Sequence, residues 1–244
     1  MKAIIASSFV MLALVIALPA TADQSVFSQN AVGYVKINME PGQLAMLHNT
    51  FEPLDPGVDP TPSAVFGSSL PVGTRLFVWD ADSQSYQTDT FREEIGPPPT
   101  LTVTTNWAFD VFILDPGTAF WLEIPANTDG DTDVVLLGQV PELSEAQVPI
   151  FEGLNMVAYS FPTEVEWTET ELAQNASVGD RIFFWNTETG SYNQSIYRVE
   201  IGPPPDLIET TSWSFEITIP AGKGFWYQSA DSKTWSENKP YPWP

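Results

Sequence analysis

Residues 73–79 (GTRLFVW) return 106 positions later as residues 179–185 (GDRIFFW). The proline-rich segment at residues 92–99 (REEIGPPP) returns at the same spacing as residues 198–205 (RVEIGPPP). A self-similarity of this length indicates that one structural unit has been duplicated within the chain. Two units of about 105 residues each are large enough to bury a hydrophobic core. The sequence therefore predicts two tandem domains of related fold.

The segments inside the repeat are short, rich in β-branched and aromatic residues, and bounded by Gly, Pro, Asn and Asp, which is typical of strands. We predict an all-β fold of two related β-sandwich or small-barrel domains, at residues 23–142 and 143–244. Helical character is confined to residues 168–175 and, more weakly, 144–147. The second domain is expected to lack a counterpart of the first strand, because residues 147–151 (QVPIF) stand in its place. Strands are expected at residues 32–39, 44–48, 75–80, 85–91, 101–109, 119–123, 134–140, 154–160, 181–186, 191–199, 207–218 and 224–228.

The first 22 residues have the features of a signal peptide. Lys2 precedes an apolar run over residues 3–18, and residues 20–22 (ATA) form a small-residue cleavage motif. An uncleaved N-terminal anchor is the alternative. We predict a secreted protein, extracellular or at the cell surface, with no membrane span in its mature form.

Composition excludes several functional classes. The chain has 9 Lys and Arg against 31 Asp and Glu, a formal net charge of −22. No basic face is available for nucleic acid, and anionic membranes are disfavoured. Without cysteine, and with one histidine, thiolate chemistry, ordinary zinc sites and most histidine catalysis are excluded. That histidine, His48, lies in an apolar run and is predicted to be a core or turn residue. We therefore predict no catalytic residue.

Two arginines stand beside the proline-rich segments. Arg92 and Arg198 each precede a carboxylate, Glu94 and Glu200, by two residues, and residues two apart on a strand share a face. Structural ion pairs are the favoured interpretation, and an anion-binding arginine is the alternative. The GPPP loops that follow are either rigid connections or docking surfaces for a neighbouring chain.

Six of the nine tryptophans occupy duplicated positions, and we expect them in the core. The remaining three lie outside the duplication, and two of them belong to the C-terminal segment. Exposed aromatics next to acidic residues can form a glycan-binding face, and they can equally dock a tail onto a partner. The candidate contact residues are Trp167, Trp235, Tyr241 and Trp243.

Residues 127–133 (NTDGDTD) carry oxygen-bearing side chains at every second position, as in the opening of a calcium loop. The candidate metal ligands are Asn127, Asp129, Asp131 and Asp133. The pattern departs from such a loop because Gly is fourth rather than sixth and the twelfth residue is Gly138. An ordinary acidic surface turn is the alternative, and no other cofactor is expected.

A resemblance adds context. Residues 30–35 (NAVGYV), the segment at 73–79 and residues 116–121 (PGTAFW) resemble a set of uncharacterised secreted bacterial proteins, in which a VGYV strand precedes a late PGxGF element. Here Ala119 replaces the second glycine of that element. The resemblance implies an extracellular context and no particular site.

These observations favour a structural or interaction protein, a subunit of an extracellular filament, surface layer or matrix. Residues 23–30 and the proline-rich tail would be the assembly elements, because an extended arm can add a strand to a neighbour. The expected partner is another copy or another extracellular protein. An extracellular polysaccharide-binding module is the alternative, and a carboxylate-based glycosidase is the weakest.

Overall fold

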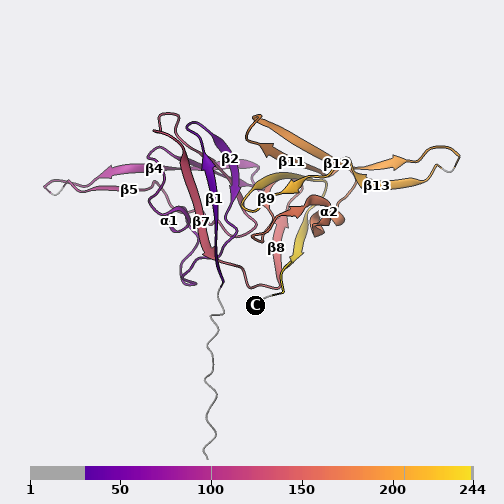
Figure 1. Ribbon diagram of the computed structural model, residues 1–244, viewed down its shortest axis with the longest axis horizontal. Coiled ribbons are helices and arrows are strands. Elements are labelled where there is room, and N and C mark those ends of the chain that lie inside the picture. The colour runs from indigo at the N-terminus through magenta and orange to yellow at the C-terminus, as the bar shows by residue number, and fades with distance from the viewer. Residues whose placement is uncertain (1–30, 100, 206, 243–244) are drawn as a thin grey trace, which may run out of the picture.

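The computed structural model describes residues 31–99, 101–205 and 207–242, and they form an all-β protein of two similar halves (Figure 1). The first half contains β1 (Val32–Met39), β2 (Leu44–His48), α1 (Pro62–Phe66), β3 (Arg75–Asp80), β4 (Ser85–Ile95), β5 (Val103–Trp107), β6 (Ala119–Glu123) and β7 (Thr132–Gln139). The second half contains β8 (Glu145–Ile150), β9 (Gly153–Ala158), β10 (Val165–Glu166), the 3-10 turn η1 (Trp167–Glu169), α2 (Glu171–Gln174), β11 (Arg181–Asn186), β12 (Ser191–Ile201), β13 (Glu209–Trp213), β14 (Thr218–Ile219), β15 (Gly224–Ser229) and β16 (Lys233–Asn238).

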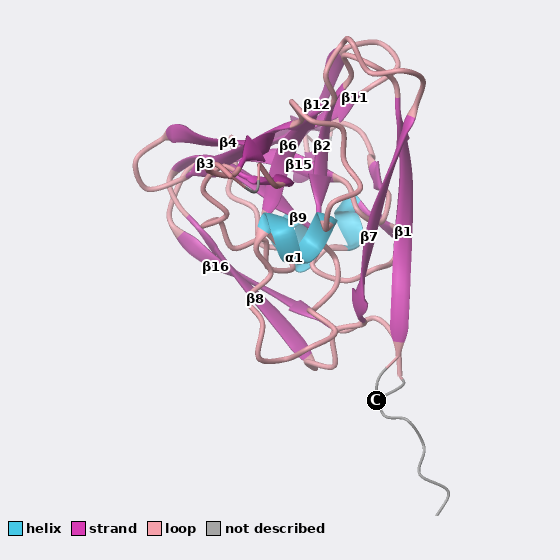
Figure 2. Ribbon diagram, turned by 90° about the vertical axis from the view of Figure 1, so that its left-hand side faces the viewer, coloured by secondary structure: helices cyan, strands magenta, loops and turns pink. Residues whose placement is uncertain are grey.

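Each half is a small sandwich with the same topology. A five-stranded antiparallel sheet has the order β2-β6-β3-β4-β5 in the first half and β9-β15-β11-β12-β13 in the second. A two-stranded ribbon covers one face, β1-β7 in the first half and β8-β16 in the second, so the first strand of each half pairs with its last. Figure 2 shows the two ribbons flanking the molecule. The predicted fold class is confirmed.

Residues 144–147, expected to have helical character, instead enter strand β8. The second half does have a counterpart of the first strand, because β8 pairs with β16 as β1 pairs with β7. Val148 and Ile150 of β8 point into the core on either side of Pro149, whose ring supplies no N–H to the ladder. The sequence interpretation missed β16 and α1. The helix expected over 168–175 is present in shorter form as α2, capped by Thr170.

Between ribbon and sheet, each half buries its own hydrophobic core. The core of the first half includes Leu47, Leu76, Phe91 and Phe120. The core of the second half is more aromatic and includes Phe161, Trp167, Ile182, Phe225, Tyr227 and Trp235. Successive side chains of a strand point to opposite faces of the sheet, so each strand also has an outward face that these cores do not cover.

The outward faces of the two five-stranded sheets meet in a third apolar cluster that joins the halves. Most of it comes from the same positions of both copies: Leu44, Met46, Phe77, Trp79 and Trp121 with Leu154, Met156, Phe183, Trp185 and Trp226, to which Ala119 and Ala158 are added. Four of the six duplicated tryptophans therefore form the contact between halves, while Trp107 and Trp213 pack within their own halves.

The hydrogen bonds across this contact are reciprocal. The Trp79 indole N–H donates to the Leu154 carbonyl at 2.9 Å, and the Trp185 indole N–H donates to the Leu44 carbonyl at 3.2 Å. Two backbone bonds, each 3.0 Å long, run from the His48 amide to the Gly222 carbonyl and from the Ala158 amide to the Gly117 carbonyl. Because these four bonds form two pairs at equivalent positions, the halves are related by an approximate two-fold axis. No helix among the described residues is long and apolar enough to cross a membrane.

Candidate functional site

Two hairpin arms extend from opposite ends of the molecule (Figure 1). Strand β4 pairs with β3 through residues 85–90, but beyond Phe91 it pairs only with β5. Strand β12 repeats this arrangement, pairing with β11 up to Ile196 and only with β13 from Tyr197 onward. Each arm is thus a two-stranded ribbon outside the sandwich, and β5 and β13 are edge strands.

The outer part of each arm exposes apolar side chains. Ile95 is 67% exposed and Ile201, at the equivalent position, is 65% exposed. Other exposed apolar residues on the arms are Leu101, Val103, Val199, Leu207 and Ile208. A two-stranded ribbon is marginal in water unless another surface covers it. Apolar groups clustered on a projecting element mark an interaction surface.

The arm tips are closed by the GPPP loops. Gly96 donates its amide proton to the Thr102 carbonyl, and Gly202 donates to the Ile208 carbonyl, both at 2.8 Å. Both tips contain a cis peptide bond, Pro98-Pro99 and Pro204-Pro205. Three successive prolines carry no N–H, so the tip cannot itself continue a ladder and leaves pairing to the edge strands.

Both ion pairs expected from the sequence are present at the base of the arms. Arg92 pairs with Glu94, and Arg198 pairs with Glu200 at 2.9 Å, each within one strand. Hydrogen bonds from Asn106 and then Arg92 lower the pKa of the Glu94 carboxyl. All four side chains are about half exposed, so these pairs set side-chain orientation more than stability.

The expected N-terminal assembly arm, residues 23–30, and the signal peptide lie outside the described residues. Strand β1 follows them, and its outer face together with that of β7 exposes Val32, Tyr34, Val135 and Leu137. This ribbon face is a second exposed apolar surface.

The four calcium candidates do not converge. Asp133 lies on β7 and pairs with Lys36 at 2.7 Å, while Asn127, Asp129 and Asp131 lie in the exposed turn before it. Hydrogen bonds from Lys36 and Asn38 lower the pKa of Asp133. Across residues 31–99, 101–205 and 207–242, no group of three or more His, Cys, Asp or Glu side chains is placed to hold a metal ion.

The aromatics proposed to contact a partner or glycan are mostly internal. Trp167 is 0% exposed and Trp235 is 2% exposed, and both belong to the core of the second half. Tyr241 packs against that core and donates its hydroxyl proton to the Pro141 carbonyl at 3.0 Å. Trp243 lies outside the described residues. Trp167 and Trp235 thus stabilise the second half and present no surface to a ligand, which corrects that part of the sequence interpretation.

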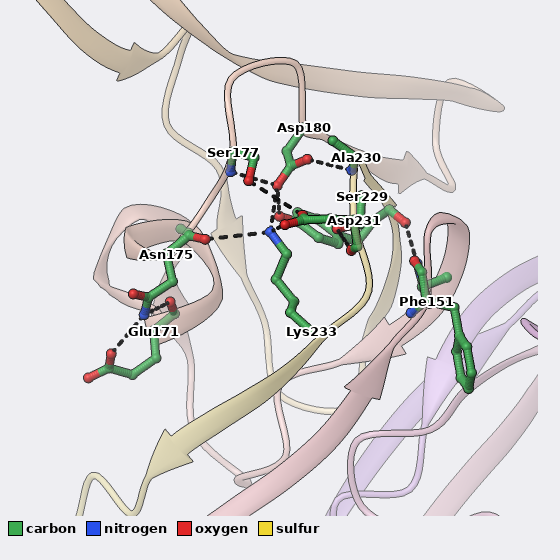
Figure 3. Close-up of polar contacts among 12 residues, drawn as sticks. Phe151, Glu171, Asn175, Ser177, Asp180, Ser229, Ala230, Asp231 and Lys233 are labelled. Atoms are coloured by element: carbon green, nitrogen blue, oxygen red, sulfur yellow. Dashed lines mark hydrogen bonds and ion pairs between the residues drawn. The ribbon is translucent and has the colours of Figure 1, made fainter.

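A buried polar network surrounds Asp180 in the second half (Figure 3). Asp180, whose side chain is fully buried, accepts hydrogen bonds from the Ala230 amide at 2.8 Å and the Ser177 amide at 2.9 Å, and pairs with Lys233 at 3.1 Å. The Tyr227 hydroxyl also donates to it. Burial by itself raises the pKa of Asp180, but these bonds outweigh it and leave the pKa below its ordinary value. The first half has Thr74 at the equivalent position, so the network is a local brace.

One cleft of about 380 Å³ brings two carboxyls together. Glu52 and Asp115 both line it, and burial is the main cause of a raised pKa in each. Glycoside hydrolysis needs one carboxyl to be protonated while the other is ionised, so the environments should move the two pKa values apart. Here both shift in the same direction, and this pair defines no acid and base.

His48 is buried, as expected for a core histidine, and lies where the halves meet. Neither ring nitrogen has a hydrogen bond of normal geometry. Burial lowers its pKa to about 3, although the Tyr159 backbone acts in the opposite direction. A neutral histidine without an oriented partner is not arranged for proton transfer.

No family model, curated protein or solved structure matches this chain. The arms, the ribbon face and the contact between the halves are the surfaces that bear on function.

Proposed function

We propose that this protein is an extracellular assembly subunit whose two arms pair with the arms of other copies. The observation that carries the proposal is that both arms leave the sandwich and expose the same apolar positions, Ile95 with Ile201 and Leu101 with Leu207. An edge strand with unpaired backbone groups, beside exposed apolar side chains, is the arrangement used for strand addition.

A second copy suits the arms better than an unrelated partner. Each arm carries a basic and an acidic side chain on one strand, Arg92 with Glu94 or Arg198 with Glu200. Within the arm, β4 and β12 have no strand among the described residues on the side away from β5 and β13, and two such strands placed antiparallel would bring unlike charges opposite each other, which favours pairing of like arms. Because every chain has two arms at opposite ends, such contacts join copies into open chains (Figure 1).

Overall charge acts against this assembly. A formal charge of −22 makes copies repel, and added salt screens that repulsion. Assembly should therefore strengthen with ionic strength, which is the opposite of a contact held together mainly by ion pairs.

The test uses mature protein, residues 23–244, in sedimentation velocity and negative-stain electron microscopy over a range of concentration and salt. The wild type should form species larger than a monomer, and the fourfold variant Ile95→Lys, Leu101→Lys, Ile201→Lys, Leu207→Lys should remain monomeric. Val135→Ser with Leu137→Ser, which alters the exposed ribbon face, is the matched control and should still assemble. A wild type that stays monomeric at high concentration and salt contradicts the proposal, as does unchanged assembly of the fourfold variant.

A further inference from the structure

Beside the contact between the halves lies an open aromatic cleft of about 510 Å³. Its floor is the outward face of the first sheet, and its far wall is the β11-β12 hairpin of the second half. The lining residues are Leu44, Phe77, Tyr86, Thr88, Trp121, Glu123, Trp185 and Tyr192. A cleft of this size falls within the range of small-ligand sites.

The cleft combines ring faces with polar groups at their edges. Tyr86 is 47% exposed and Tyr192 is 43% exposed. The Trp121 indole N–H donates to the Tyr86 hydroxyl oxygen at 3.2 Å, which leaves the phenolic proton free to donate to a ligand. Arg75 holds the Glu123 carboxylate in place beside them. Aromatic rings with hydroxyl and carboxylate groups at the rim suit a ligand with apolar ring faces and hydroxyl edges.

The duplication generates an equivalent surface on the second sheet, and there a side chain from the first half lies against it. Leu154 is the equivalent of Leu44, and the Gln84 side chain lies across it. The Gln84 amide donates to the Leu154 carbonyl at 3.1 Å, and the Leu154 amide donates back to the Gln84 side-chain oxygen at 3.3 Å. At the open cleft the residue equivalent to Gln84 is Gly190, which has no side chain and no atom within 4 Å of where one would begin.

The backbone conformation at these two turn positions adds to the difference between Gln84 and Gly190. Gln84 has a φ of 50° and Gly190 a φ of 61°, so both occupy the left-handed region that favours glycine. A glutamine is held there against its backbone preference, and its side chain makes the bonds that cover the equivalent surface. Strain retained at one copy of a repeated turn indicates a role for the side chain.

We propose that the open cleft binds a neutral oligosaccharide, by stacking on Phe77, Tyr86 and Trp185, and that Gln84 restricts the protein to one such site per chain. Pyranose rings have the apolar faces and hydroxyl edges that the cleft offers. The chain's charge of −22 and the carboxylate of Glu123 disfavour an acidic sugar. This site is separate from the arms, so it goes beyond the assembly function and can fail independently of it.

The first test is calorimetric titration of the mature protein with cellotetraose, mannotetraose and xylotetraose, with tetragalacturonate and decanoate as acidic and acyl-chain comparisons. At least one neutral tetrasaccharide should bind with a stoichiometry of one. Phe77→Ala should weaken that binding about tenfold or more, since it removes a stacking face. Phe183→Ala is the matched control, because Phe183 is the same residue of the duplicated unit on the covered side, and it should bind as the wild type does.

The second test exchanges the turn residues. Gly190→Gln should cover the open cleft and remove binding, whereas Gly190→Ala, which adds no covering side chain, should retain it. Gln84→Gly should uncover the equivalent surface of the second sheet and raise the stoichiometry from one to two. Both turns are exposed, so these variants remain informative if Phe77→Ala unfolds, and thermal unfolding by circular dichroism checks each one.

Three outcomes overturn the proposal. The first is failure of all three neutral tetrasaccharides to bind, or tighter binding of decanoate or tetragalacturonate. The second is equal weakening by Phe77→Ala and Phe183→Ala in folded proteins. The third is unchanged binding by folded Gly190→Gln. None of these outcomes bears on the arm variants, whose sedimentation tests assembly alone.

Discussion

Ala119 and Gly224 are the same position of the duplicated unit, and they lie against each other where the halves meet. A Cβ added to Gly224 would overlap the Ala119 methyl group and crowd Met46. The contact therefore has room for one methyl group at this point, which Ala119 supplies while Gly224 supplies none.

Replacing Gly224 with alanine should destabilise the protein by about 1–3 kcal/mol, the usual cost of overpacking a filled interior. Ala119→Gly combined with Gly224→Ala moves the methyl group to the other side and should recover most of that loss. Urea unfolding of the two single variants and the double variant measures the coupling. Purely additive effects would show that the two residues do not compete for the same space.

His48 should make stability fall as the pH drops below neutral. Its pKa is about 3 in the folded protein and near 6.5 in the unfolded chain, so between these values the unfolded state binds the extra proton. The wild type should therefore lose about 2 kcal/mol more than His48→Leu between pH 7 and pH 5.

Comparing the wild type with His48→Leu separates the contribution of His48 from that of the other titratable groups. Glu52, Asp115 and Glu237 have raised pKa values, and their contributions to stability decline as the pH rises, but they are the same in both proteins. Urea midpoints at the two pH values give the difference. Parallel behaviour of wild type and variant would mean that His48 is not held neutral.

Removing the Asp180 carboxylate should be costly. Asp180→Thr introduces the residue found at the equivalent Thr74 and leaves Lys233 and Tyr227 without their buried acceptor, for an expected loss of about 3–5 kcal/mol. Asp231→Ala is the control, since Asp231 contacts the same Lys233 from the surface and should cost under about 1 kcal/mol.

The pH dependence gives a second readout for Asp180. Its lowered pKa means that its contribution is present above the unfolded pKa of 3.8 and is lost as the pH falls through the folded value. Asp180→Thr should therefore be less sensitive to acid than the wild type below pH 4. Equal thermal stabilities of Asp180→Thr and Asp231→Ala would contradict the role of this brace.

Blocking one arm should limit assembly to pairs. With Ile95→Lys and Leu101→Lys, only the second arm can pair, so sedimentation should show a dimer as the largest species. Ile201→Lys with Leu207→Lys should give the same result from the other end. Long chains formed by either one-arm variant would show that assembly does not proceed from arm to arm.

The repeat made the fold predictable because it fixed the unit length and marked matching strands. Strands such as β3 and β11 are short runs of aliphatic and aromatic residues that follow a glycine, and their bounds agree with the prediction. Strand β16 was missed because it carries mostly polar residues. Its buried Glu237 is satisfied internally, by the Trp235 indole and the Glu171 amide, which no local pattern reveals.

The functional surfaces were less accessible to sequence reasoning. The sequence of an apolar strand face is the same whether the core of its own domain, another domain or a ligand covers it. Trp79 and Trp185 were therefore expected in a core, whereas they lie at the contact between the halves. The unpaired tryptophans were expected at the surface, yet Trp235 fills the core against Phe225. The difference between Gln84 and Gly190 was visible, but its meaning depends on Leu154, which is distant in sequence.

The reciprocal bonds between His48 and Gly222 and between Ala158 and Gly117 also show what the duplication permits. A single unit that paired with its own copy in this way would place identical residues across the axis. Alanine on both sides would collide at position 119. The contact accepts the Ala119 methyl group because the two copies are encoded separately and Gly224 occupies the equivalent position.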